Sequence, residues 1–311
     1  MKPEKKHKRI IDQIKQAIQQ ASTVGITTHV RPDGDAIGSV LGLGLALRAS
    51  GKKVQMVLPS GVSHTFKHLP SAELITRSFE SPCDLYISLD CADMKRSRGI
   101  PADVQVNILI DHHITNERYA RINLVDPDAV ATCAILGELI PQLGLTIDQP
   151  VASALLAGII SDSIGFRTSN TNPAALRLSA ALMEAGADLY AIYNKSLVSR
   201  PYVAARYWGF ALERMQNEHG LIWTSLTLDD RKKSGYKLED DADLTNLLSS
   251  IEECKISVLF VEQSKTKTKV SWRSVPGVDV SVLAAEFNGG GHPAAAGAEL
   301  SGSLQEIQQK V

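Results

Sequence analysis

Histidine and aspartate residues gather in four short segments between residues 28 and 171. One segment reads THVRPDGDAIGS and holds His29, Asp33 and Asp35 between two apolar runs. A strand-to-helix turn also uses an Asp-Gly pair and a capping aspartate, so this segment alone leaves a turn and half of a metal site open. An EF-hand calcium loop fits poorly, because the glutamate expected at its last position is Gly44.

The other three segments place carboxylates and imidazoles at the ends of apolar runs. SLDCAD ends a run at Asp90, where a lone aspartate is also common as a cap or turn residue. LIDHHITN sets Asp111 before His112 and His113, whose desolvation is costly unless something binds them; a solvated loop is the alternative. LAGIISDSIGFRTSNT puts Asp162 at the end of an apolar helix, where the helix dipole disfavours a carboxylate and a nearby cation would favour it.

Together the four segments offer imidazoles and at least four carboxylates but no thiolate. This donor set suits Mn²⁺ or Mg²⁺, with Co²⁺ as an alternative, better than it suits a structural zinc ion. Carboxylates crowded into one pocket repel each other unless more than one divalent cation shares them. Two such ions about 3.5–4 Å apart form the usual clamp for displacement at phosphorus. The donor set therefore predicts phosphoester hydrolysis.

An α/β fold with a mainly parallel sheet would bring these segments together. Apolar runs of strand length alternate with helical patterns: TVGITTH, KKVQMVL, DLYISLD, VQVNILID and ARINLVD are the strands, and 8–21, 36–50, 131–143, 149–160 and 173–186 are the helices. This alternation predicts βαβ units, with helices flanking the sheet. Ligands of such sheets lie beyond the carboxyl ends of the strands. Since His29, Asp90 and Asp111 follow three of the strands, we expect them at one edge.

After about residue 190 the pattern changes. A helical stretch leads into the alternating strand HGLIWTSLTL, a charged segment follows at 229–243, and strands near 255–263 and 267–273 precede a helix near 279–287. This order predicts a smaller α/β domain that begins near residue 215.

Two motifs in this second domain suit phosphate binding. Arg273 in WRS can bind a phosphate through two hydrogen bonds, and Ser274 adds a hydroxyl donor. NGGGHPAAAG contains His292 and three consecutive glycines whose backbone N–H groups can surround a phosphate: Gly289, Gly290 and Gly291. A flexible loop before a strand is the alternative for the glycine motif.

The composition narrows the class of protein. Of 311 residues, 44% are hydrophobic and 22% are charged, which is ordinary for a globular protein, and the net charge of -1 gives no global basic field for long nucleic acids or anionic membranes. The cysteines form no CxxC pair, which is typical of a reducing compartment. The longest apolar stretch, VASALLAGII, is about half of the ~20 residues that a membrane span needs. We expect a cytoplasmic protein.

The four motifs resemble, in order, those of the DHH phosphoesterase superfamily, and VSWRSVPGVDVSVLAAEFNGGGHPAAAGAEL resembles its DHHA1 domain. Among subfamilies, the chain is most similar to the stand-alone oligoribonucleases that also act as phosphatases of 3′-phosphoadenosine 5′-phosphate (pAp). The resemblance implies a DHH catalytic domain over 1–190, a helical linker over 191–214 and a DHHA1 substrate-binding domain over 215–311.

The resemblance also implies a role for each site residue. One metal ion would be held by His29, Asp33 and Asp90. The other would be held by Asp35, Asp90, His112 and Asp162, so that Asp90 bridges the two ions. His113 would face the substrate phosphate or the leaving oxygen, and Asp111 would orient a histidine. The substrate's far end would be held by Arg273, Ser274, Gly289, Gly290, Gly291 and His292.

The implied activity is the Mn²⁺-dependent hydrolysis of oligonucleotides of about two to five nucleotides to mononucleotides, with removal of the 3′-phosphate of pAp. The alternatives are a phosphodiesterase of cyclic dinucleotides or linear diadenylate and a RecJ-like single-strand exonuclease, although RecJ-type enzymes carry an additional nucleic-acid-binding domain. A nucleotide-binding protein without catalysis is a further alternative. The expected partners are short oligoribonucleotides or nucleotide phosphates, with no membrane and no obligate protein partner, and a homodimer stays open.

The second domain departs from the subfamily pattern at two points. VPG follows the Arg-Ser pair where a basic residue is often seen, and PAAAG follows His292 where a basic or polar residue is more usual. Both changes remove positive charge near the substrate's far end, which bears on the preferred substrate length more than on catalysis.

Overall fold

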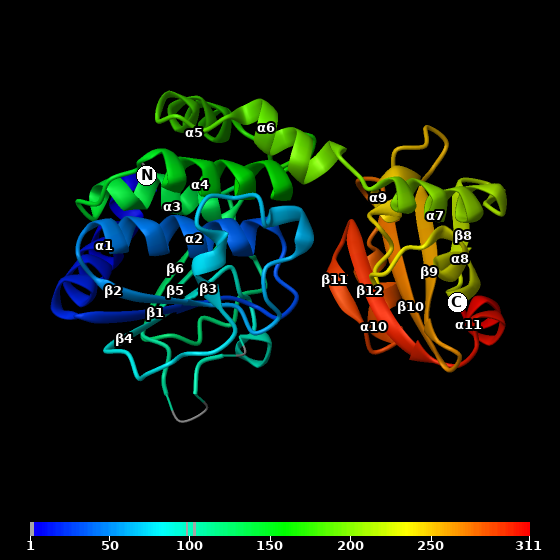
Figure 1. Cartoon of the computed structure of the whole chain (residues 1–311), viewed down its shortest axis with the longest axis horizontal. Helices are drawn as coiled ribbons and strands as arrows, with labels where there is room; N and C mark the ends of the chain where they lie inside the picture. The colour runs from blue at the N-terminus through cyan, green and yellow to red at the C-terminus, as the bar shows by residue number, and fades with distance from the viewer. Residues whose placement is uncertain (1–2, 98, 102–103) are drawn as a thin grey trace. The chain divides into compact units, whose positions relative to one another are not determined.

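The computed structural model describes residues 3–97, 99–101 and 104–311, which form two compact units (Figure 1). The first unit extends to Ser199 and the second begins at Arg200, ahead of the expected start at 215. The difference arises from helix α7 (Tyr202–Glu213), which lies in the expected linker 191–214. Its buried residues Ala204, Tyr207 and Ala211 belong to the core of the second unit.

The first unit is built on a six-stranded parallel sheet with the strand order β3-β2-β1-β4-β5-β6. The strands are β1 (Thr23–Thr27), β2 (Lys53–Val57), β3 (Ile75–Thr76), β4 (Leu85–Leu89), β5 (Ile108–Asp111) and β6 (Ile122–Val125). The mainly parallel sheet of the prediction is confirmed. The strand order reverses between β1 and β4, and ligands of open α/β sheets bind outside the carboxyl ends of the strands at such a point.

Helices pack on one face of this sheet and irregular connections cover the other (Figure 1). The helical layer contains α2 (Gly34–Ala49), α3 (Thr132–Gln142) and α4 (Gln149–Asp162). On the opposite face, Tyr86 packs with residues of the connections, including Phe79 and Tyr119. Because both faces are covered, the strands carry near-continuous apolar runs, as in LYISL.

Further helices surround this core. They are α1 (Pro3–Gln20), α5 (Pro173–Glu184), α6 (Leu189–Tyr193), a π-helical turn (Asn194–Val198) and 3₁₀ turns at His64–Phe66, Ala72–Leu74 and Met94–Arg96. Among the described residues, no helix has both the length and the apolar character required to cross a membrane.

The second unit has a mixed six-stranded sheet with the order β11-β12-β10-β9-β8-β7, in which only the β8–β9 pair is parallel. Its strands are β7 (Gln216–Glu218), β8 (Leu221–Leu226), β9 (Ile256–Ser264), β10 (Lys267–Ser274), β11 (Gly290–His292) and β12 (Ala295–Ser301). Its helices besides α7 are α8 (Leu228–Ser234), α9 (Leu244–Leu248), α10 (Val280–Glu286) and α11 (Leu304–Lys310).

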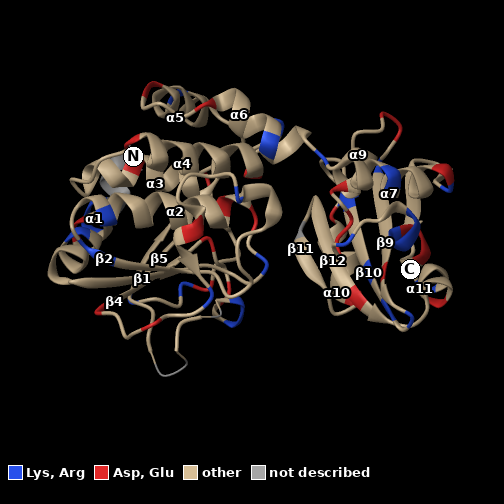
Figure 2. Cartoon of the chain, in the orientation of Figure 1, with Lys and Arg blue, Asp and Glu red and all other residues tan. Residues whose placement is uncertain are grey.

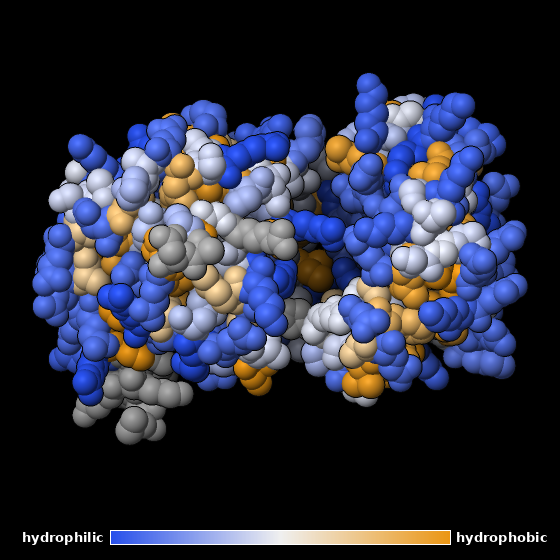
Figure 3. Space-filling model, turned by 90° about the horizontal axis from the view of Figure 1, so that it is seen from below, coloured by the Kyte–Doolittle hydropathy of each residue, from blue (hydrophilic) through white to orange (hydrophobic). Residues whose placement is uncertain are grey.

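Each unit carries charge of both signs on its surface. Acidic and basic residues are interspersed along both units (Figure 2). In the view of Figure 3, hydrophilic residues predominate and hydrophobic ones are exposed in small groups.

Candidate metal centre

The predicted ligands of the first unit meet at the carboxyl edge of the parallel sheet. Strand β1 leads to His29, β4 leads directly to Asp90, and β5 ends at Asp111 before the two adjacent histidines. Since β4 pairs with both β1 and β5, these three chain segments are neighbours in space. Asp162, the last residue of α4, lies beside them, with its Oδ2 atom 3.5 Å from Nε2 of His112.

Helix α2 brings two further carboxylates. Asp33 is its N-cap residue and accepts a hydrogen bond of 3.0 Å from the backbone N–H of Ala36. Asp35 lies in the first turn, is 1% exposed, and has its carboxylate aimed into the centre. Gly34 between them is required by packing, because a Cβ atom there would lie 2.3 Å from Oγ of Ser161 on α4. A glycine therefore lets α2 and α4 approach closely enough for their carboxylates to share one site.

The side chains form three overlapping groups, and in each group the ligand atoms lie within 4.8 Å of one another. The groups are His29, Asp33 and Asp90; Asp35, His112 and Asp162; and Asp90, His112 and His113. The distances between partners are 3.5–3.9 Å for most pairs, too long for hydrogen bonds but short enough for two atoms to reach one ion. The first group is the predicted ligand set of one ion. The second group is the predicted set of the other ion without Asp90.

Hydrogen bonds fix which nitrogen of each histidine faces the centre. Nδ1 of His29 lies 2.9 Å from the carbonyl of Val30, and Nδ1 of His112 lies 3.3 Å from that of Ala129. A carbonyl can only accept, so Nδ1 of His112 carries the proton. Nδ1 of His29 also lies 3.3 Å from the guanidinium of Arg96, which can only donate, and the shorter contact with the carbonyl favours a proton on Nδ1 there as well. The lone pair of Nε2 then points toward the carboxylates, which is the arrangement that a metal-ligating histidine requires.

His113 is held differently from the other two histidines. Its Nδ1 atom lies 2.7 Å from Oδ1 of Asp111, which is completely buried. The same oxygen accepts hydrogen bonds from the backbone N–H groups of His112 and His113, at 2.7 and 3.2 Å. Asp111 thus fixes the shape of the turn that carries both histidines.

The carboxylates of the centre repel one another. Burial and the neighbouring charge of Asp90 raise the pKa of Asp35 to about 7. Burial and the charge of Asp35 raise the pKa of Asp162 well above its usual range. Burial would also raise the pKa of Asp90, but the neighbouring imidazoles of His29, His112 and His113 hold it below the usual range.

The same carboxylates stabilise the protonated form of a neighbouring histidine. Burial lowers the pKa of His112, but the charges of Asp35, Asp162 and Asp90 outweigh it and raise the pKa to about 9. The centre therefore takes up protons where it has no other cation. Buried carboxylates and imidazoles that hold protons near neutral pH can bind divalent cations instead. The cations then replace the protons and supply the positive charge that the carboxylates need.

Two groups that the sequence did not single out also hold the ligands. The backbone N–H groups of Thr132 and Cys133, in the first turn of α3, donate to the two oxygens of Asp35 at 2.6 and 2.9 Å. The hydroxyl of Thr132 donates to Oδ1 of Asp90 at 3.0 Å. A threonine at a helix start was visible in the sequence, but its partners are distant along the chain, so no local pattern could reveal the contact.

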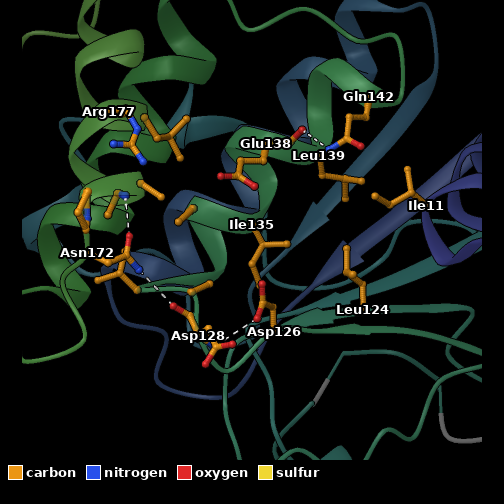
Figure 4. Close-up of a pocket in the computed structure, with 17 residues that line it drawn as sticks. Ile11, Leu124, Asp126, Asp128, Ile135, Glu138, Leu139, Gln142, Asn172 and Arg177 are labelled. Carbon is orange, nitrogen blue, oxygen red and sulfur yellow. Dashed lines mark hydrogen bonds between the residues drawn. The ribbon is translucent and has the colours of Figure 1, made fainter. Parts of the chain in front are cut away.

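A cavity of about 430 Å³ lies behind this segment, between β6, α3 and α5 (Figure 4). Asn172 donates to the carbonyl of Asp128, and the N–H of Asp128 donates to Asp126, at 3.3 and 3.2 Å. None of the predicted site residues lines the cavity, although Ala129 in its wall accepts the hydrogen bond of His112. The cavity is a separate hollow that shares a wall with the metal centre.

The predicted substrate-binding residues of the second unit lie on adjacent strands. Arg273 on β10 pairs with Ala295 on β12, which in turn pairs with His292 on β11. The glycine motif therefore contains an edge strand, not only a loop. A Cβ atom at Gly289 or Gly291 would lie 2.3 Å from a backbone oxygen of β12, whereas Gly290 has open space beside it. The side chain of His292 lies outside the described part of the chain.

Arg273 and Ser274 both make hydrogen bonds within the fold. Burial lowers the pKa of the Arg273 guanidinium, although the charges of Asp241 and Asp243 raise it. Its Nη1 donates to the carbonyl of Trp272 at 3.0 Å. The hydroxyl of Ser274 lies 2.6 Å from the carbonyl of Val278 and 3.2 Å from that of Pro293, so two acceptors within the fold already compete for its proton.

Comparisons with known proteins place the chain in a family. The family model described as DHH family, N-terminal domain matches residues 23–159, and the DHHA1 domain model matches residues 233–311. The chain is 35% identical over 306 residues to the bifunctional oligoribonuclease and PAP phosphatase NrnA of Thermus thermophilus, covering 97% of this chain and 91% of that protein. It is 27% identical to the protein of the same name from Bacillus subtilis, covering 89% of each.

Among solved structures, an exopolyphosphatase-related protein from Bacteroides fragilis superposes with a TM-score of 0.91 at 29% identity. The match covers 97% of this chain and 94% of that one, so the similarity extends through both units.

Proposed function

The chain belongs to the DHH family and is a metal-dependent phosphoesterase, and we propose that it hydrolyses short oligonucleotides to mononucleotides and removes the 3′-phosphate of pAp. The names of the similar proteins from Thermus thermophilus and Bacillus subtilis support this choice of substrates, since both are bifunctional oligoribonucleases and PAP phosphatases. The proposed place of action is the cytoplasm, which the four free cysteines support.

The observation that carries the proposal is the overlap of the ligand groups at Asp90 and His112, each of which belongs to two groups. One ion cannot use all of these donors, so we propose two divalent cations, with Mn²⁺ ahead of Mg²⁺ and Co²⁺ because the donors combine carboxylate and imidazole. When bound, such cations supply Lewis acidity toward the phosphate and offset the charge of the carboxylates.

Side chains of both units are proposed to position the substrate. We propose that His113 faces the substrate phosphate or the leaving oxygen, with Nδ1 held 2.7 Å from Asp111 so that the opposite side of the ring is presented. In the second unit, Arg273, Ser274 and the glycines at 289–291 are proposed to bind the far end of the substrate. The partly buried guanidinium of Arg273 supports this, because a bound phosphate would offset its loss of hydration.

A substrate panel tests the proposal. Purified protein with Mn²⁺ is given an RNA dinucleotide, a single-stranded RNA of about 20 nucleotides, pAp, and linear and cyclic diadenylate, each with an EDTA control. We expect rapid hydrolysis of the dinucleotide and pAp, slow hydrolysis of the long strand and no hydrolysis in EDTA.

Each other outcome points elsewhere. Preference for the long strand would indicate a RecJ-like exonuclease, and preference for either diadenylate would indicate a phosphodiesterase of signalling nucleotides. Turnover that persists in EDTA would contradict the two-metal mechanism itself.

A further inference from the structure

One side chain joins two of the strand ends that carry the metal centre. Asn116 lies in the loop between β5 and β6, five positions after Asp111. Its Nδ2 atom donates to Oδ2 of Asp111, and it also donates to the backbone carbonyl of Cys91 at 3.2 Å. Cys91 directly follows Asp90 at the end of β4, so a single amide links the ends of β4 and β5.

The orientation of this amide is fixed on its other side as well. Oδ1 of Asn116 accepts a hydrogen bond of 2.6 Å from the backbone N–H of Arg118. An N–H group can only donate, so the oxygen of the amide must face Arg118 and the NH₂ group must face Asp111 and Cys91. Both protons and one acceptor position of the side chain are used, which leaves the amide no alternative arrangement of equal energy.

The backbone that Asn116 contacts is unusual. Asp90 has a φ of 51°, in the left-handed region that non-glycine residues rarely occupy because it is strained for them. The hydroxyl of Tyr119 donates to the same Cys91 carbonyl at 3.1 Å. Two side chains from one loop therefore hold the Cys91–Ala92 peptide group, one residue beyond the left-handed Asp90, whose carboxylate lies between His29 and His112.

The hydrogen bond from Asn116 to Asp111 connects the amide to His113. One oxygen of Asp111 is bonded to the histidine turn and to Nδ1 of His113, and the other accepts the hydrogen bond from Asn116. Without the amide, Oδ2 would be a buried carboxylate oxygen that lacks this donor, and a rotation of the carboxylate would move the partner of His113.

We propose that Asn116 is a positioning residue, which sets the orientation of His113 through Asp111 and holds the left-handed turn at Asp90. The proposal rests on the proposed function, because it assigns the role within that reaction. Among the described residues, the side chain of Asn116 hydrogen-bonds Asp111, Cys91 and Arg118 and none of the proposed metal ligands.

Two substitutions of Asn116 distinguish the loss of its N–H donors from the loss of its side-chain volume. Asn116→Asp keeps the volume but removes both N–H donors and sets a carboxylate against Asp111. Asn116→Ala removes the whole group. Asn123→Ala is the matched control, because Asn123 also bridges a loop, with its amide bonded to both backbone groups of Ala120 at 3.1 and 2.7 Å. It lies on β6, outside the metal centre.

The first measurement uses metal-free protein and needs no turnover. Ring ¹⁵N chemical shifts of the histidines report which nitrogen carries the proton, and a His113→Ala spectrum assigns the signals. We expect a proton on Nδ1 of His113 in the wild type, a changed signal in both Asn116 variants, and the wild-type signal in Asn123→Ala.

The second measurement is steady-state kinetics with the RNA dinucleotide and Mn²⁺. We expect kcat to fall about 10–100-fold in both Asn116 variants, with KM changed much less, since substituting a residue that orients metal ligands typically has this effect on activity. Asn123→Ala should keep the wild-type kcat.

The outcomes discriminate cleanly. Wild-type kcat and an unchanged His113 signal in Asn116→Asp would overturn the proposal. Lost activity with an unchanged His113 signal would overturn it too, since the amide would then act on turnover by a route other than the orientation of His113. A wild type that hydrolyses none of the substrates would remove the proposed function, whereas a His113 signal that moves in the Asn116 variants would still support the positioning role.

Discussion

The two carboxylate oxygens of Asp90 face different histidines. Oδ2 lies 3.7 Å from Nε2 of His29, and Oδ1 lies 3.7 Å from Nε2 of His112. Asp90 is 1% exposed, and its pKa stays below the usual range in spite of burial because three imidazoles surround it. A carboxylate that stays ionised between two separate nitrogen donors has the geometry of a bridge between two cations.

Substitution of this residue provides the most direct prediction at this scale. Asp90→Asn should lower kcat/KM for the dinucleotide by more than about 100-fold, since even residues that only orient ligands alter activity by 10–100-fold. The circular dichroism spectrum should not change. Asp128→Asn, an exposed carboxylate after β6, is the control and should retain activity. Comparable activity in the two variants would contradict the bridging role.

At the scale of elements, the packing of α2 against α4 decides whether the ligands meet. Gly34 at the start of α2 lies where a Cβ atom would come within 2.4 Å of both Phe66 and Cβ of Ser161. These neighbours belong to separate packed elements, so neither can yield freely. The separation between the carboxylates of α2 and Asp162 of α4 therefore depends on the absence of one methyl group.

A pair of identical substitutions tests this dependence. Gly34→Ala should lower the free energy of unfolding by about 1–3 kcal/mol and weaken Mn²⁺ binding, because an overpacked contact pushes the helices apart. Gly209→Ala, in the exposed part of α7 with no atom within 4 Å of the added Cβ, should raise stability by about 0.5–1 kcal/mol. Denaturant melts and Mn²⁺ titration calorimetry measure both; the same sign for both variants would show that contact geometry does not matter.

Helix α8 begins with a capping box in which Thr227 and Asp230 exchange hydrogen bonds. Asp230 also receives a hydrogen bond of 2.8 Å from Nη2 of Arg214. Burial would raise the pKa of Asp230, but the bonds from Arg214 and Thr227 lower it below its ordinary value of 3.8. The ionised carboxylate is thus more favourable in the folded chain than in the unfolded one.

This shift gives a pH-dependent prediction. A lowered folded pKa means that the stabilisation is fully present above the unfolded pKa of 3.8 and is lost as the pH falls through the folded value. Asp230→Asn should therefore unfold more easily than the wild type by about 1–2 kcal/mol at pH 7, and the difference should shrink below about pH 4. Urea melts at pH 7, 5 and 3 check this; a difference that grows toward acid pH would refute it.

The sequence predicted the parallel sheet and the gathering of ligands because several buried strands end abruptly in a polar residue, as the strand before Asp90 does. Strand order, which places β4 between β1 and β5, depends on long-range packing and could not be read from local patterns. The interpretation assigned no structure to 229–243, although a capping box at Thr227 signals a helix there. Asn116 and Thr132 escaped notice because their partners are set by the tertiary fold.

At the scale of the whole molecule, each unit has its own hydrophobic core. The first core centres on residues such as Ile26, Leu41 and Leu155, and the second has one cluster on each face of its sheet, around Tyr207 and Trp272. All of the predicted metal ligands lie in the first unit, and all of the predicted substrate-binding residues lie in the second. Metal binding and substrate binding should therefore be separable.

Separate expression of residues 1–199 and 200–311 tests this separation. Both fragments should melt cooperatively, since each encloses its own core. The first fragment should bind Mn²⁺ with an affinity close to that of the whole chain but should hydrolyse the dinucleotide at least about tenfold less efficiently, because it lacks the proposed substrate-binding residues. Failure of the first fragment to bind Mn²⁺ would show that the second unit contributes to the metal centre.

The boundary at Ser199 also has a consequence for biosynthesis. Each unit is one uninterrupted stretch of chain, and the first is complete before Arg200 is translated. Domains generally fold as units, with the N-terminal one first, while the ribosome is still elongating the chain. The segments that carry the metal ligands, from His29 to Asp162, can thus assemble on the ribosome and acquire ions from the cell before the part that would bind the substrate has been made.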